Sequence, residues 1–502
     1  MKITIIFGGK AGQGPNLLSE IVSQGLLIAG YYVFYSREYQ SLIRGGHNYN
    51  ILTFSDKPVS SNESKIDLLI CLDDNTKKIH KSQLKKQGLV IEGEKGNLFY
   101  AGSVFKILGL KLEILEQTLK KMNKYDDFID EAKAGYNFEK RKLIDLKPLK
   151  NNSLDFMNGS QAIAEASLSS GLELYYAYPM TPATPLMMEL GQMQLDKKSE
   201  HKVIELESEI AVINAALGSS MVGKIAMVGT SGGGFDLMTE ALSLSGMAEI
   251  PLVIYLSSRP GPSTGLATYT GQGDLNLALY SGHGEFSRIV VAPGDIEETF
   301  EKTNECFALS EKFGIPCILL GDKHLGESKF ITLKNPSIKK VFKKKNWPAK
   351  FNSYEHNSEG IAIEDIETIN KNFEARIKKH KDIALEVSKL ETYRVYGNKD
   401  SKNIILFWGS TKGAIIDAFS ESGIDAKLIQ LLYIEPFPEK IKEELKGAKK
   451  IIVIENNATS PLSNLLSEKT QNIIEDKNKI LKYDGRPFFS DLLAQEIKRR
   501  IK

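Results

Sequence analysis

Short apolar segments alternate along this chain with longer segments in which apolar residues recur at helical spacing. Ile3–Phe7 is a β-branched apolar run, followed by the glycine-rich stretch 8–14 and then, from Pro15, by a helical pattern. Asp67–Leu72 is a second apolar run of strand length. A strand, a glycine loop, a helix and a further strand in this order are typical of a parallel α/β sheet. Residues 1–150 therefore predict an α/β domain.

A polar stretch between about residues 125 and 152 separates this domain from a second α/β region. Glycine-rich loops directly follow two of its predicted strands, at 231–234 and 261–273. Because open parallel sheets bind ligands at the carboxyl ends of their strands, we expect the site at these loops. The pattern predicts strands at 173–178, 225–229, 251–257, 288–292 and 315–320, and helices at 160–170, 184–194, 209–221, 236–247 and 296–312.

Residues 331–398 have a different character. They contain the basic run Lys339, Lys340, Lys343, Lys344 and Lys345, and then a polar helical stretch at 361–390. We interpret this segment as a solvated connector rather than an anion site. Strands predicted at 403–408, 426–430, 450–454 and 478–482 indicate a third α/β unit at 399–502. The expected fold is α/β, with three domains at 1–150, 151–330 and 399–502 and mostly parallel sheets.

Length and charge agree with this picture and exclude some partners. The 502 residues suit roughly three domains. Lys and Arg total 65 against 63 Asp and Glu, so no strong field indicates nucleic acid or a membrane surface. The three cysteines, Cys71, Cys306 and Cys317, have no CxxC spacing. We therefore expect neither a disulfide framework nor a four-cysteine metal site formed by this chain alone.

The amino-terminal stretch MKITIIFGGK lacks the long apolar segment and cleavage site of a signal peptide. Apolar runs elsewhere, such as 250–256, have the length of strands, well below the ~20 residues of a membrane span. We therefore expect a cytoplasmic protein.

The first glycine loop fits two interpretations. Gly9, Gly12 and Gly14 form GxxGxG, the reverse of the dinucleotide fingerprint, and no P-loop lysine follows. The loop is either a phosphate cradle or a tight turn that needs glycines. The nearby segment Arg44-Gly45-Gly46-His47 is either a surface turn or a loop that contacts a cofactor or a partner domain.

A proline-rich segment ends the predicted strand at 173–178. Its sequence is Tyr178-Pro179-Met180-Thr181-Pro182-Ala183-Thr184-Pro185. Because proline fixes φ, this loop is stiff and holds Thr181 in a defined place. Thr184 is suited to cap the next helix, but capping does not account for Thr181.

Two charged residues in the second region are candidates for chemistry. Ser208 is suited to cap the helix at 209–221, which leaves Glu209 at the first helical position. There a carboxylate either favours the helix dipole or serves a reaction. Arg259 directly follows a predicted strand and precedes a loop rich in glycine and proline. It either forms a structural ion pair or binds the carboxylate or phosphate of a ligand.

Several segments together resemble a known family. YPMTPATP, ELESEIAVINAALGSS, GTSGGGFDLMTEALSLSGMAEIPLVI, SSRPGPSTGLATYTGQGDL and SGHGEF resemble the α subunit of 2-oxoacid:ferredoxin oxidoreductases. GGKAGQG and REYQSLIRGGHN resemble the γ domain of that family, fused ahead of α. WGSTKGA, YIEPFP, IIVIENNATSPLSNLL and LKYDGRPF resemble its transketolase-C-like domain. The resemblance covers nearly the whole chain.

The resemblance implies a thiamine diphosphate enzyme that oxidatively decarboxylates a 2-oxoacid, forms an acyl-CoA and reduces ferredoxin. It implies a pyrimidine-binding domain at 151–330, where the residue matching Glu209 acts on the aminopyrimidine of the cofactor. Tyr178 and Pro179 would also contact the cofactor, and Thr181 and Arg259 would bind the substrate carboxylate. Gly12, Gly14, Arg44 and Gly45 would form a loop that contacts CoA or another domain.

The resemblance also explains an absence. Thiamine enzymes hold the diphosphate and its Mg²⁺ with a GDG motif, which this sequence lacks. In the family that motif and the cysteines of the [4Fe-4S] cluster belong to a separate β subunit. The resemblance therefore implies a β partner, an (αβ)₂ assembly, ferredoxin as electron acceptor, and no activity of this chain alone.

Departures from the family pattern leave the substrate open. Ala11 and Met180 replace a glycine and an isoleucine, and Tyr269 stands where many relatives have Lys or Arg. We expect 2-oxoglutarate as substrate, with pyruvate, branched-chain or aryl 2-oxoacids as alternatives. From other classes, a non-catalytic scaffold that docks electron carriers and an NAD-binding oxidoreductase that uses loop 8–14 also remain.

Overall fold

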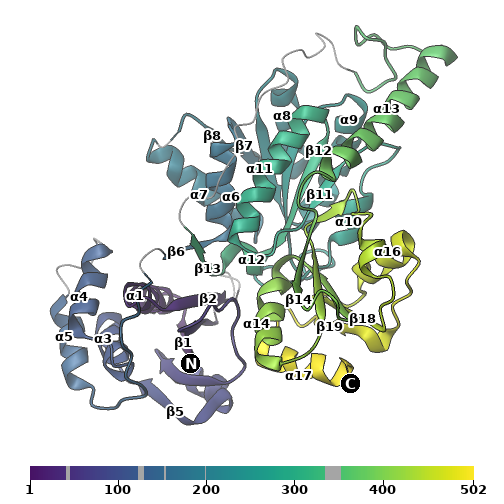
Figure 1. Ribbon diagram of the computed structural model, residues 1–502. Coiled ribbons are helices and arrows are strands. Elements are labelled where there is room, and N and C mark those ends of the chain that lie inside the picture. The colour runs from purple at the N-terminus through teal and green to yellow at the C-terminus, as the bar shows by residue number, and fades with distance from the viewer. Residues whose placement is uncertain (41–45, 123–128, 152–153, 198, 334–351, 502) are drawn as a thin grey trace.

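The computed structural model describes residues 1–40, 46–122, 129–151, 154–197, 199–333 and 352–501. They form three α/β units, each built on a mixed sheet, which confirms the fold class that the sequence predicts (Figure 1). The run of lysines at 339–345, which we interpreted as part of a solvated connector, lies outside the described residues. None of the described helices combines the length and the apolar character needed to cross a bilayer.

The first sheet has the strand order β5-β4-β1-β3-β2-β13-β6. β1 is parallel to β4 but antiparallel to β3, so this sheet is mixed. α1 begins with Pro15 and packs Leu18, Ile21, Val22 and Leu26 into the core. The strands are β1 (Lys2–Lys10), β2 (Tyr32–Glu38), β3 (His47–Ser55), β4 (Ile66–Cys71), β5 (Leu84–Glu92), β6 (Leu154–Asn158) and β13 (Lys329–Leu333), and the helices are α1 (Pro15–Ile28), α2 (Asp74–His80), α3 (Asn97–Ile107), α4 (Leu112–Lys121) and α5 (Ile129–Phe138).

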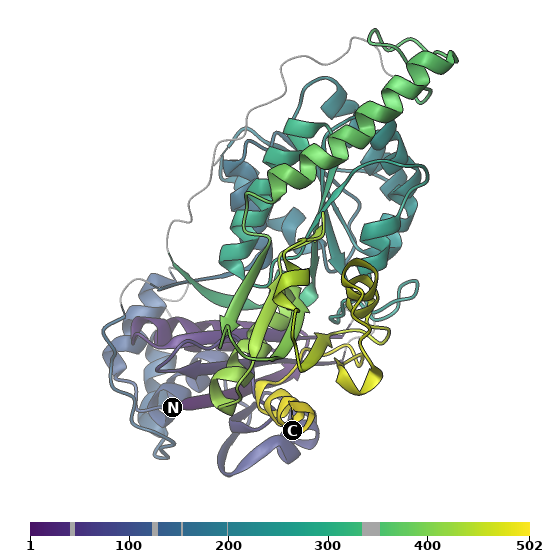
Figure 2. The ribbon, with the colours of Figure 1, turned by 45° about the vertical axis from the view of Figure 1, so that its right-hand side comes forward.

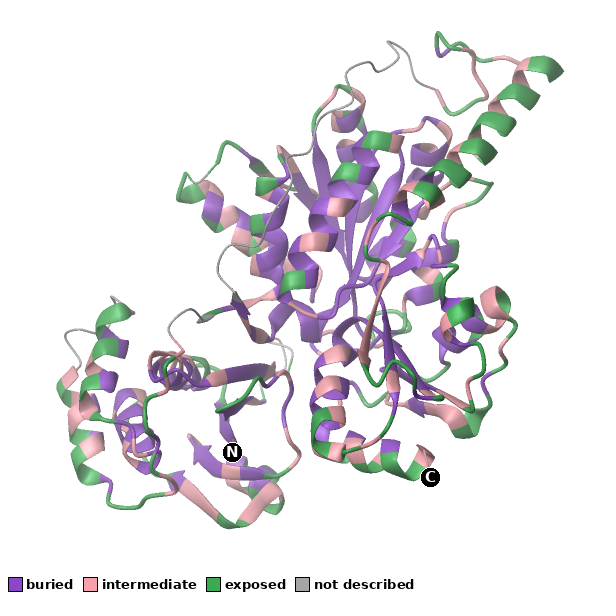
Figure 3. Cartoon of the chain, in the orientation of Figure 1, coloured by how far each residue is buried: buried purple, intermediate pink, exposed green. Residues whose placement is uncertain are grey.

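The second sheet has the order β17-β11-β12-β10-β9-β7-β8, and all its strands except β17 are parallel. The inner strands β9, β10 and β12 are entirely buried because helices cover both faces, whereas the edge strand β8 is partly exposed (Figure 3). The strands are β7 (Leu174–Ala177), β8 (Lys202–Glu205), β9 (Ala226–Thr230), β10 (Leu252–Ser258), β11 (Ile289–Val291), β12 (Pro316–Asp322) and β17 (Tyr433–Glu435), and the helices are α6 (Gly159–Ser169), α7 (Thr184–Leu195), α8 (Glu209–Met221), α9 (Gly232–Met247), α10 (Leu275–Tyr280), α11 (Ile296–Phe313) and α12 (Lys323–Glu327).

The third sheet has the order β14-β16-β15-β18-β19, with β14 as an antiparallel edge. The long helix α13 (Ile366–Val387) precedes it and projects from the second unit, with Ile383 and Val387 as its buried residues (Figure 2). The strands are β14 (Tyr393–Gly397), β15 (Asn403–Trp408), β16 (Lys427–Leu431), β18 (Lys450–Glu455) and β19 (Lys479–Leu481), and the helices are α14 (Lys412–Ser422), α15 (Ile441–Glu444), α16 (Pro461–Thr470) and α17 (Ser490–Ile501).

Several strands pair with a sheet outside their own stretch of sequence. β6 and β13 flank the second unit in the chain but pair with each other at the edge of the first sheet. β17 leaves the third unit and extends the second sheet as a partner of β11. The third unit also contacts the first, where Ser61 Oγ donates to Asp417 Oδ2 at 2.7 Å. The three units are thus joined by shared strands as well as by side chains.

Candidate active site

The carboxyl edge of the second sheet gathers the charged residues that the sequence indicates. β7 ends at Ala177, β9 at Thr230 and β10 at Ser258, directly before Arg259. These strands are parallel neighbours, so their ends meet at one edge of the sheet. α8, which follows β8, begins with Glu209 at the same edge. This edge is where parallel sheets bind ligands.

Glu209 is a buried carboxylate without a complete set of donors. Ser208 Oγ accepts a hydrogen bond from the Ala211 amide at 3.3 Å, which confirms the predicted cap and the position of Glu209. Glu209 is 4% exposed, and its Oε1 has no hydrogen-bond partner among the described residues. Because an unpaired buried oxygen is costly, this position is suited to a donor brought by a ligand.

The glycines at 232–234 form the first turn of α9 and make room for Glu209. We expected a loop at 231–234 and a helix from 236, but α9 begins at Gly232. A Cβ at Gly234 would lie 2.6 Å from Glu209 Oε1 and 2.2 Å from Thr230 Oγ1. The glycine run therefore serves close packing inside a helix, which outweighs the low helix propensity of glycine.

Arg259 lies in the same cluster as Glu209. It is 8% exposed, its Nη1 donates to the carbonyl oxygen of Thr181, and its buried Nε has no partner among the described residues. Burial lowers the pKa of Arg259, while the nearby carboxylates of Asp274 and Glu209 oppose that shift. Asp274 accepts a hydrogen bond from Ser258 Oγ at 2.8 Å, and burial raises its pKa. The guanidinium thus retains donor capacity toward a ligand.

Thr181 contacts Arg259 through its backbone rather than its side chain. The resemblance implied that Thr181 and Arg259 bind the same substrate carboxylate, and the structure joins the two residues through the Thr181 carbonyl. The Thr181–Pro182 peptide bond is cis. Thr184 is the first residue of α7, which follows Ala183 and has no side-chain cap, so the predicted Thr184 cap is wrong.

The surface around the cluster carries large apolar side chains. Tyr178 is 40% exposed and Ile210, directly after Glu209, is 53% exposed. Pro179 is also exposed. Leu237 on α9 and Leu266 in the loop after Arg259 are exposed as well. Apolar exposure concentrated at the edge of a buried charged cluster is typical of a surface that another protein covers.

The first glycine loop is a tight turn held by its own side chains. Gln13 Oε1 accepts from the Lys10 amide at 2.7 Å, and Gln13 Nε2 donates to the Leu72 carbonyl at 3.0 Å. Gly12 and Gly14 have φ values of 89° and 82°, which only glycine adopts readily. The space beside Gly12 is open. Arg44 and Gly45 lie outside the described residues.

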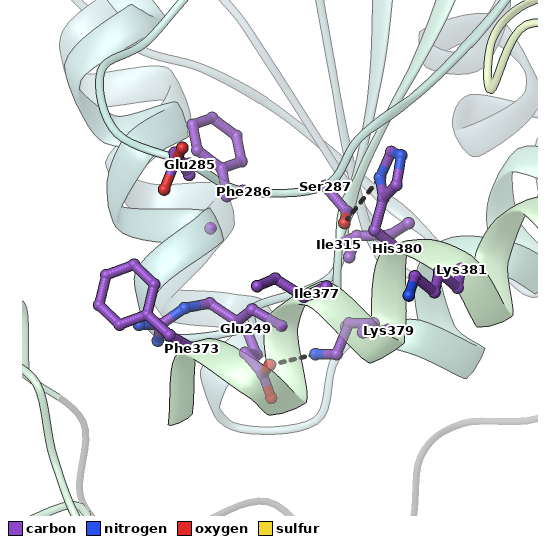
Figure 4. A pocket seen from close by; sticks show the side chains of 13 residues that line it. Glu249, Glu285, Phe286, Ser287, Ile315, Phe373, Ile377, Lys379, His380 and Lys381 are labelled. Carbon is purple, nitrogen blue, oxygen red and sulfur yellow. Dashed lines mark hydrogen bonds and ion pairs between the residues drawn. The ribbon is translucent and has the colours of Figure 1, made fainter. Parts of the chain in front are cut away.

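A cavity of about 350 Å³ lies at the opposite edge of the second sheet (Figure 4). Glu249 and Ile315, which precede β10 and β12, form one side of it, and α13 forms the other with Phe373 and Ile377. Lys379 is already paired with Glu249. Since Arg259 follows the carboxyl end of β10, this cavity is separate from the charged cluster.

Sequence reasoning missed three polar residues near the cluster. They are Asp274, which faces Ser258, and Ser231 and Ser257, whose buried hydroxyls have no partner among the described residues. Ser231 directly follows β9 in the GTSGGG stretch, and that placement was the available signal for it, whereas Asp274 in the GQGD stretch directly precedes α10. Ser257 is the last residue of the strand predicted at 251–257, and no pattern in the sequence distinguishes it from the other strand residues.

Comparison with known proteins decides the family. A model described as "Pyruvate flavodoxin/ferredoxin oxidoreductase, thiamine diP-bdg" matches residues 165–393, and "Pyruvate ferredoxin/flavodoxin oxidoreductase" matches residues 4–96. The 2-oxoacid:ferredoxin oxidoreductase subunit alpha of Sulfolobus sp is 30% identical over 626 residues, with 100% of this chain and 97% of the relative covered. The chain belongs to this α-subunit family. The resemblance seen in the sequence is confirmed.

Two further relatives are informative, one that matches part of the sequence and one that matches the whole fold. The 2-oxoglutarate synthase subunit KorA of Methanocaldococcus jannaschii is 28% identical over 334 residues, covering 61% of this chain and 88% of the relative. The 2-oxoglutarate:ferredoxin oxidoreductase from Magnetococcus marinus, solved with 2-oxoglutarate, coenzyme A and succinyl-CoA bound, has a TM-score of 0.90. At 21% identity and with 100% of both chains covered, it shows that the α subunit shares that fold throughout.

Proposed function

We propose that this α subunit forms half of a thiamine diphosphate site that oxidatively decarboxylates a 2-oxoacid, with 2-oxoglutarate as the favoured substrate. Products would be an acyl-CoA, CO₂ and reduced ferredoxin. The observation that carries the proposal is the buried Glu209 Oε1, which has no donor among the described residues and lies in one cluster with Arg259. The cluster offers an acceptor for a cofactor and a cation for a substrate.

The residues present fit the aminopyrimidine end of thiamine diphosphate. That ring presents nitrogen-bound protons, and the Glu209 carboxylate would accept one in a hydrogen bond or hold it. Gly234 leaves the carboxylate the space it needs, and Tyr178 and Pro179 stand exposed on the neighbouring loop. The cofactor, when bound, supplies a nucleophilic carbon and an electron sink for decarboxylation.

Arg259 and Thr181 would bind and orient the substrate carboxylate. The guanidinium is 8% exposed, and Nε has no partner among the described residues, so a carboxylate would satisfy it with a charge-assisted hydrogen bond. The contact with the Thr181 carbonyl limits the rotation of the guanidinium. Such fixed geometry contributes to rate by holding the reacting groups together.

A β subunit would complete the site. The exposed Tyr178, Ile210 and Leu266 beside the cluster support a protein partner there. The chain contains no GDG motif, so the diphosphate, Mg²⁺ and the [4Fe-4S] cluster are assigned to β in an (αβ)₂ assembly. We assign CoA to the first glycine loop, through Gly12 and Gly14, where the space beside Gly12 is open, and to Arg44 and Gly45 of the separate segment 44–47.

The choice of 2-oxoglutarate is supported by the names of two relatives. The Methanocaldococcus jannaschii relative is a 2-oxoglutarate synthase subunit, and the Magnetococcus marinus structure has 2-oxoglutarate bound. Pyruvate, branched-chain and aryl 2-oxoacids remain as alternatives with the same chemistry.

The test is to purify the chain together with its β subunit and to assay a panel of 2-oxoacids. CO₂ release and reduction of a viologen dye are measured with CoA, with and without thiamine diphosphate. We expect turnover that depends on the cofactor, the highest kcat/KM for 2-oxoglutarate, and no turnover by the isolated chain.

The Glu209→Ala variant of the same complex separates a catalytic subunit from a scaffold. We expect it to assemble with β but to release no CO₂, because the acceptor for the cofactor ring is removed. Full turnover by this variant would instead identify a scaffold that docks electron carriers.

A further inference from the structure

The loop that follows Arg259 is held between all three units of the chain. We define the substrate loop as residues 259–273. Thr268 Oγ1 donates to the Tyr39 carbonyl in the first unit at 2.7 Å. The Gln272 amide donates to the Asn456 carbonyl in the third unit at 2.7 Å. The position of Arg259 therefore depends on how the three units dock.

Arg486, from the third unit, contacts the loop and the first unit at once. Its guanidinium carbon lies 3.9 Å from the centre of the Tyr269 ring in the substrate loop. Its Nε lies 3.6 Å from Glu38 Oε2 at the end of β2. Tyr49 of β3 also interacts with the guanidinium through its hydroxyl. One planar cation thus links all three units.

The backbone around Arg486 is fitted to the same loop. The Thr270 amide donates to the Gly485 carbonyl at 3.2 Å. A Cβ at Gly485 would lie 3.0 Å from the Leu266 side chain and 3.2 Å from the Tyr269 Cβ, and the φ of Gly485 is 77°. Leu266 in turn donates from its amide to the Pro260 carbonyl, next to Arg259, at 2.9 Å. Continuous contacts therefore run from Arg486 to the base of the Arg259 side chain.

The contact with Glu38 favours arginine over lysine at position 486. Glu38 is 4% exposed, and its Oε2 has no hydrogen-bond partner among the described residues. Burial raises its pKa, which Lys323 and Arg486 oppose. A guanidinium can stack on an aromatic ring and face a carboxylate in the same plane, which an ammonium group does poorly.

We propose that Arg486 is a positioning residue for the substrate loop, and that it sets the affinity for the 2-oxoacid through Arg259. It touches neither substrate nor cofactor. The inference rests on the proposed function of Arg259. Its expected signature is a change in KM with little change in kcat, because Glu209 belongs to a different element and keeps its contacts.

The experiment compares Arg486→Ala, Arg486→Lys and Lys482→Ala in the complex with β. Lys482 is the matched control, because it is a nearby cation of the third unit that pairs with Asp484. We expect Arg486→Ala to raise KM for the 2-oxoacid about tenfold, with kcat within about twofold. Arg486→Lys should recover part of that loss, and Lys482→Ala should match the wild type.

Hydrogen exchange of the full chain gives a readout that does not depend on turnover. We expect Arg486→Ala to accelerate exchange of the backbone amides at 266–272, and Lys482→Ala to leave it unchanged. If the wild-type complex turns over no 2-oxoacid, the proposed function fails, and the exchange result still decides the role of Arg486. Unchanged exchange or an unchanged KM would each overturn the proposal. A fall in kcat as large as the rise in KM would overturn it as well.

Should Arg486→Ala not fold, Tyr269→Leu and Tyr269→Phe test the same contact from the loop side. Tyr269→Phe retains the ring beneath the guanidinium and should behave as the wild type. Tyr269→Leu removes the ring and should raise KM and the exchange rate in the same direction as the arginine variant. Identical behaviour of the two tyrosine variants would overturn the proposal.

Discussion

Glu209 and Glu455 are both buried glutamates at the carboxyl ends of parallel strands, but their surroundings differ. Glu455 ends β18 in the third sheet and is fully buried. Its carboxylate accepts hydrogen bonds from Trp408 Nε1 at 3.0 Å and Ser460 Oγ at 2.7 Å, and also from Asn457. Glu209 begins α8 beside the second sheet, and its Oε1 has no partner among the described residues.

The difference shows how to separate a structural carboxylate from a functional one. Both residues bury charge, so burial alone does not distinguish them. A glutamate whose donors come from its own unit stabilises that unit, because each hydrogen bond offsets desolvation. A glutamate with an unpaired oxygen destabilises the isolated chain, and its retention is explained by a donor from a ligand. Removing each carboxylate in turn should therefore have different effects on activity and on stability.

The largest expected effect comes from Glu209→Gln in the complex with β. The amide keeps the shape of the side chain but carries no charge and cannot take up or release a proton, so we expect kcat to fall by at least about 10³-fold. The free energy of unfolding should stay the same or rise, because no hydrogen bond to Oε1 is lost. Turnover and urea unfolding measured on one preparation check both statements. A variant that loses stability and activity together would place Glu209 with Glu455.

The converse variant, Glu455→Ala, should affect stability. Trp408, Ser460 and Asn457 would lose their buried acceptor, so we expect a loss on the order of 3 kcal/mol in the free energy of unfolding. Urea unfolding followed by tryptophan fluorescence reports on this unit, since Trp408 is one of the donors. Glu439→Ala, at an exposed position in the same unit, is the control and should change stability by less than about 0.5 kcal/mol.

His80 in the first unit tests whether the distinction extends to other buried titratable groups. It is 3% exposed, and its ring nitrogens lie 2.8 Å from His47 Nε2 and 2.6 Å from Gln83 Oε1. Burial lowers the pKa of His80 to about 4 from the ordinary 6.5. As pH falls from about 6.5 to 4, His80 is protonated in the unfolded chain but stays neutral in the folded chain. Stability should therefore decline between about pH 6.5 and 4, by up to roughly 3 kcal/mol.

Unfolding midpoints measured across this pH range check the statement. His80→Gln should flatten that part of the profile, whereas His283→Gln, at an exposed position, should leave the slope unchanged. Because both ring nitrogens of His80 have partners, we group it with Glu455 and expect little change in kcat at neutral pH. A profile for His80→Gln as steep as that of the wild type would contradict the assignment.

Sequence alone predicted those parts of the fold that depend on local pattern. Ser208 before an apolar helix indicated the start of α8, and the apolar runs located β9, β10 and β12. Which sheet a strand joins is different, because periodicity reports which side chains are buried but not which edge a strand pairs with. β6, β13 and the three-residue β17 therefore could not be assigned from their own residues.

The site was predictable in the identity of its charged residues but not in their contacts. Arg259 stands out because it directly follows a strand, and Glu209 because it is the first residue of a helix after a capping serine. The contact of Arg259 with the Thr181 carbonyl depends on the path of a proline-rich loop, which no residue pattern encodes. The start of α9 was placed too late because glycine has low helix propensity, and here packing against Glu209 decides.

The smallest effect, and the sharpest test of the space around Glu209, is expected from Gly234→Ala. The added Cβ would lie 2.6 Å from Glu209 Oε1 and 2.2 Å from Thr230 Oγ1, so the carboxylate must shift. We expect kcat to fall about tenfold, since small displacements of a catalytic group are costly. This overlap opposes the roughly 1 kcal/mol by which alanine favours a helix over glycine, so urea unfolding of the same variant separates a displaced carboxylate from a loss of stability.

Gly218→Ala, in the helix that carries Glu209, makes the same chemical change in open space. Its kcat should match that of the wild type, and its melting temperature should rise slightly. If both glycine variants retain full activity, the carboxylate does not need the position that Gly234 leaves for it. The contrast between Glu209 and Glu455 would then rest on hydrogen bonding alone, without the close packing that we assign to the second sheet.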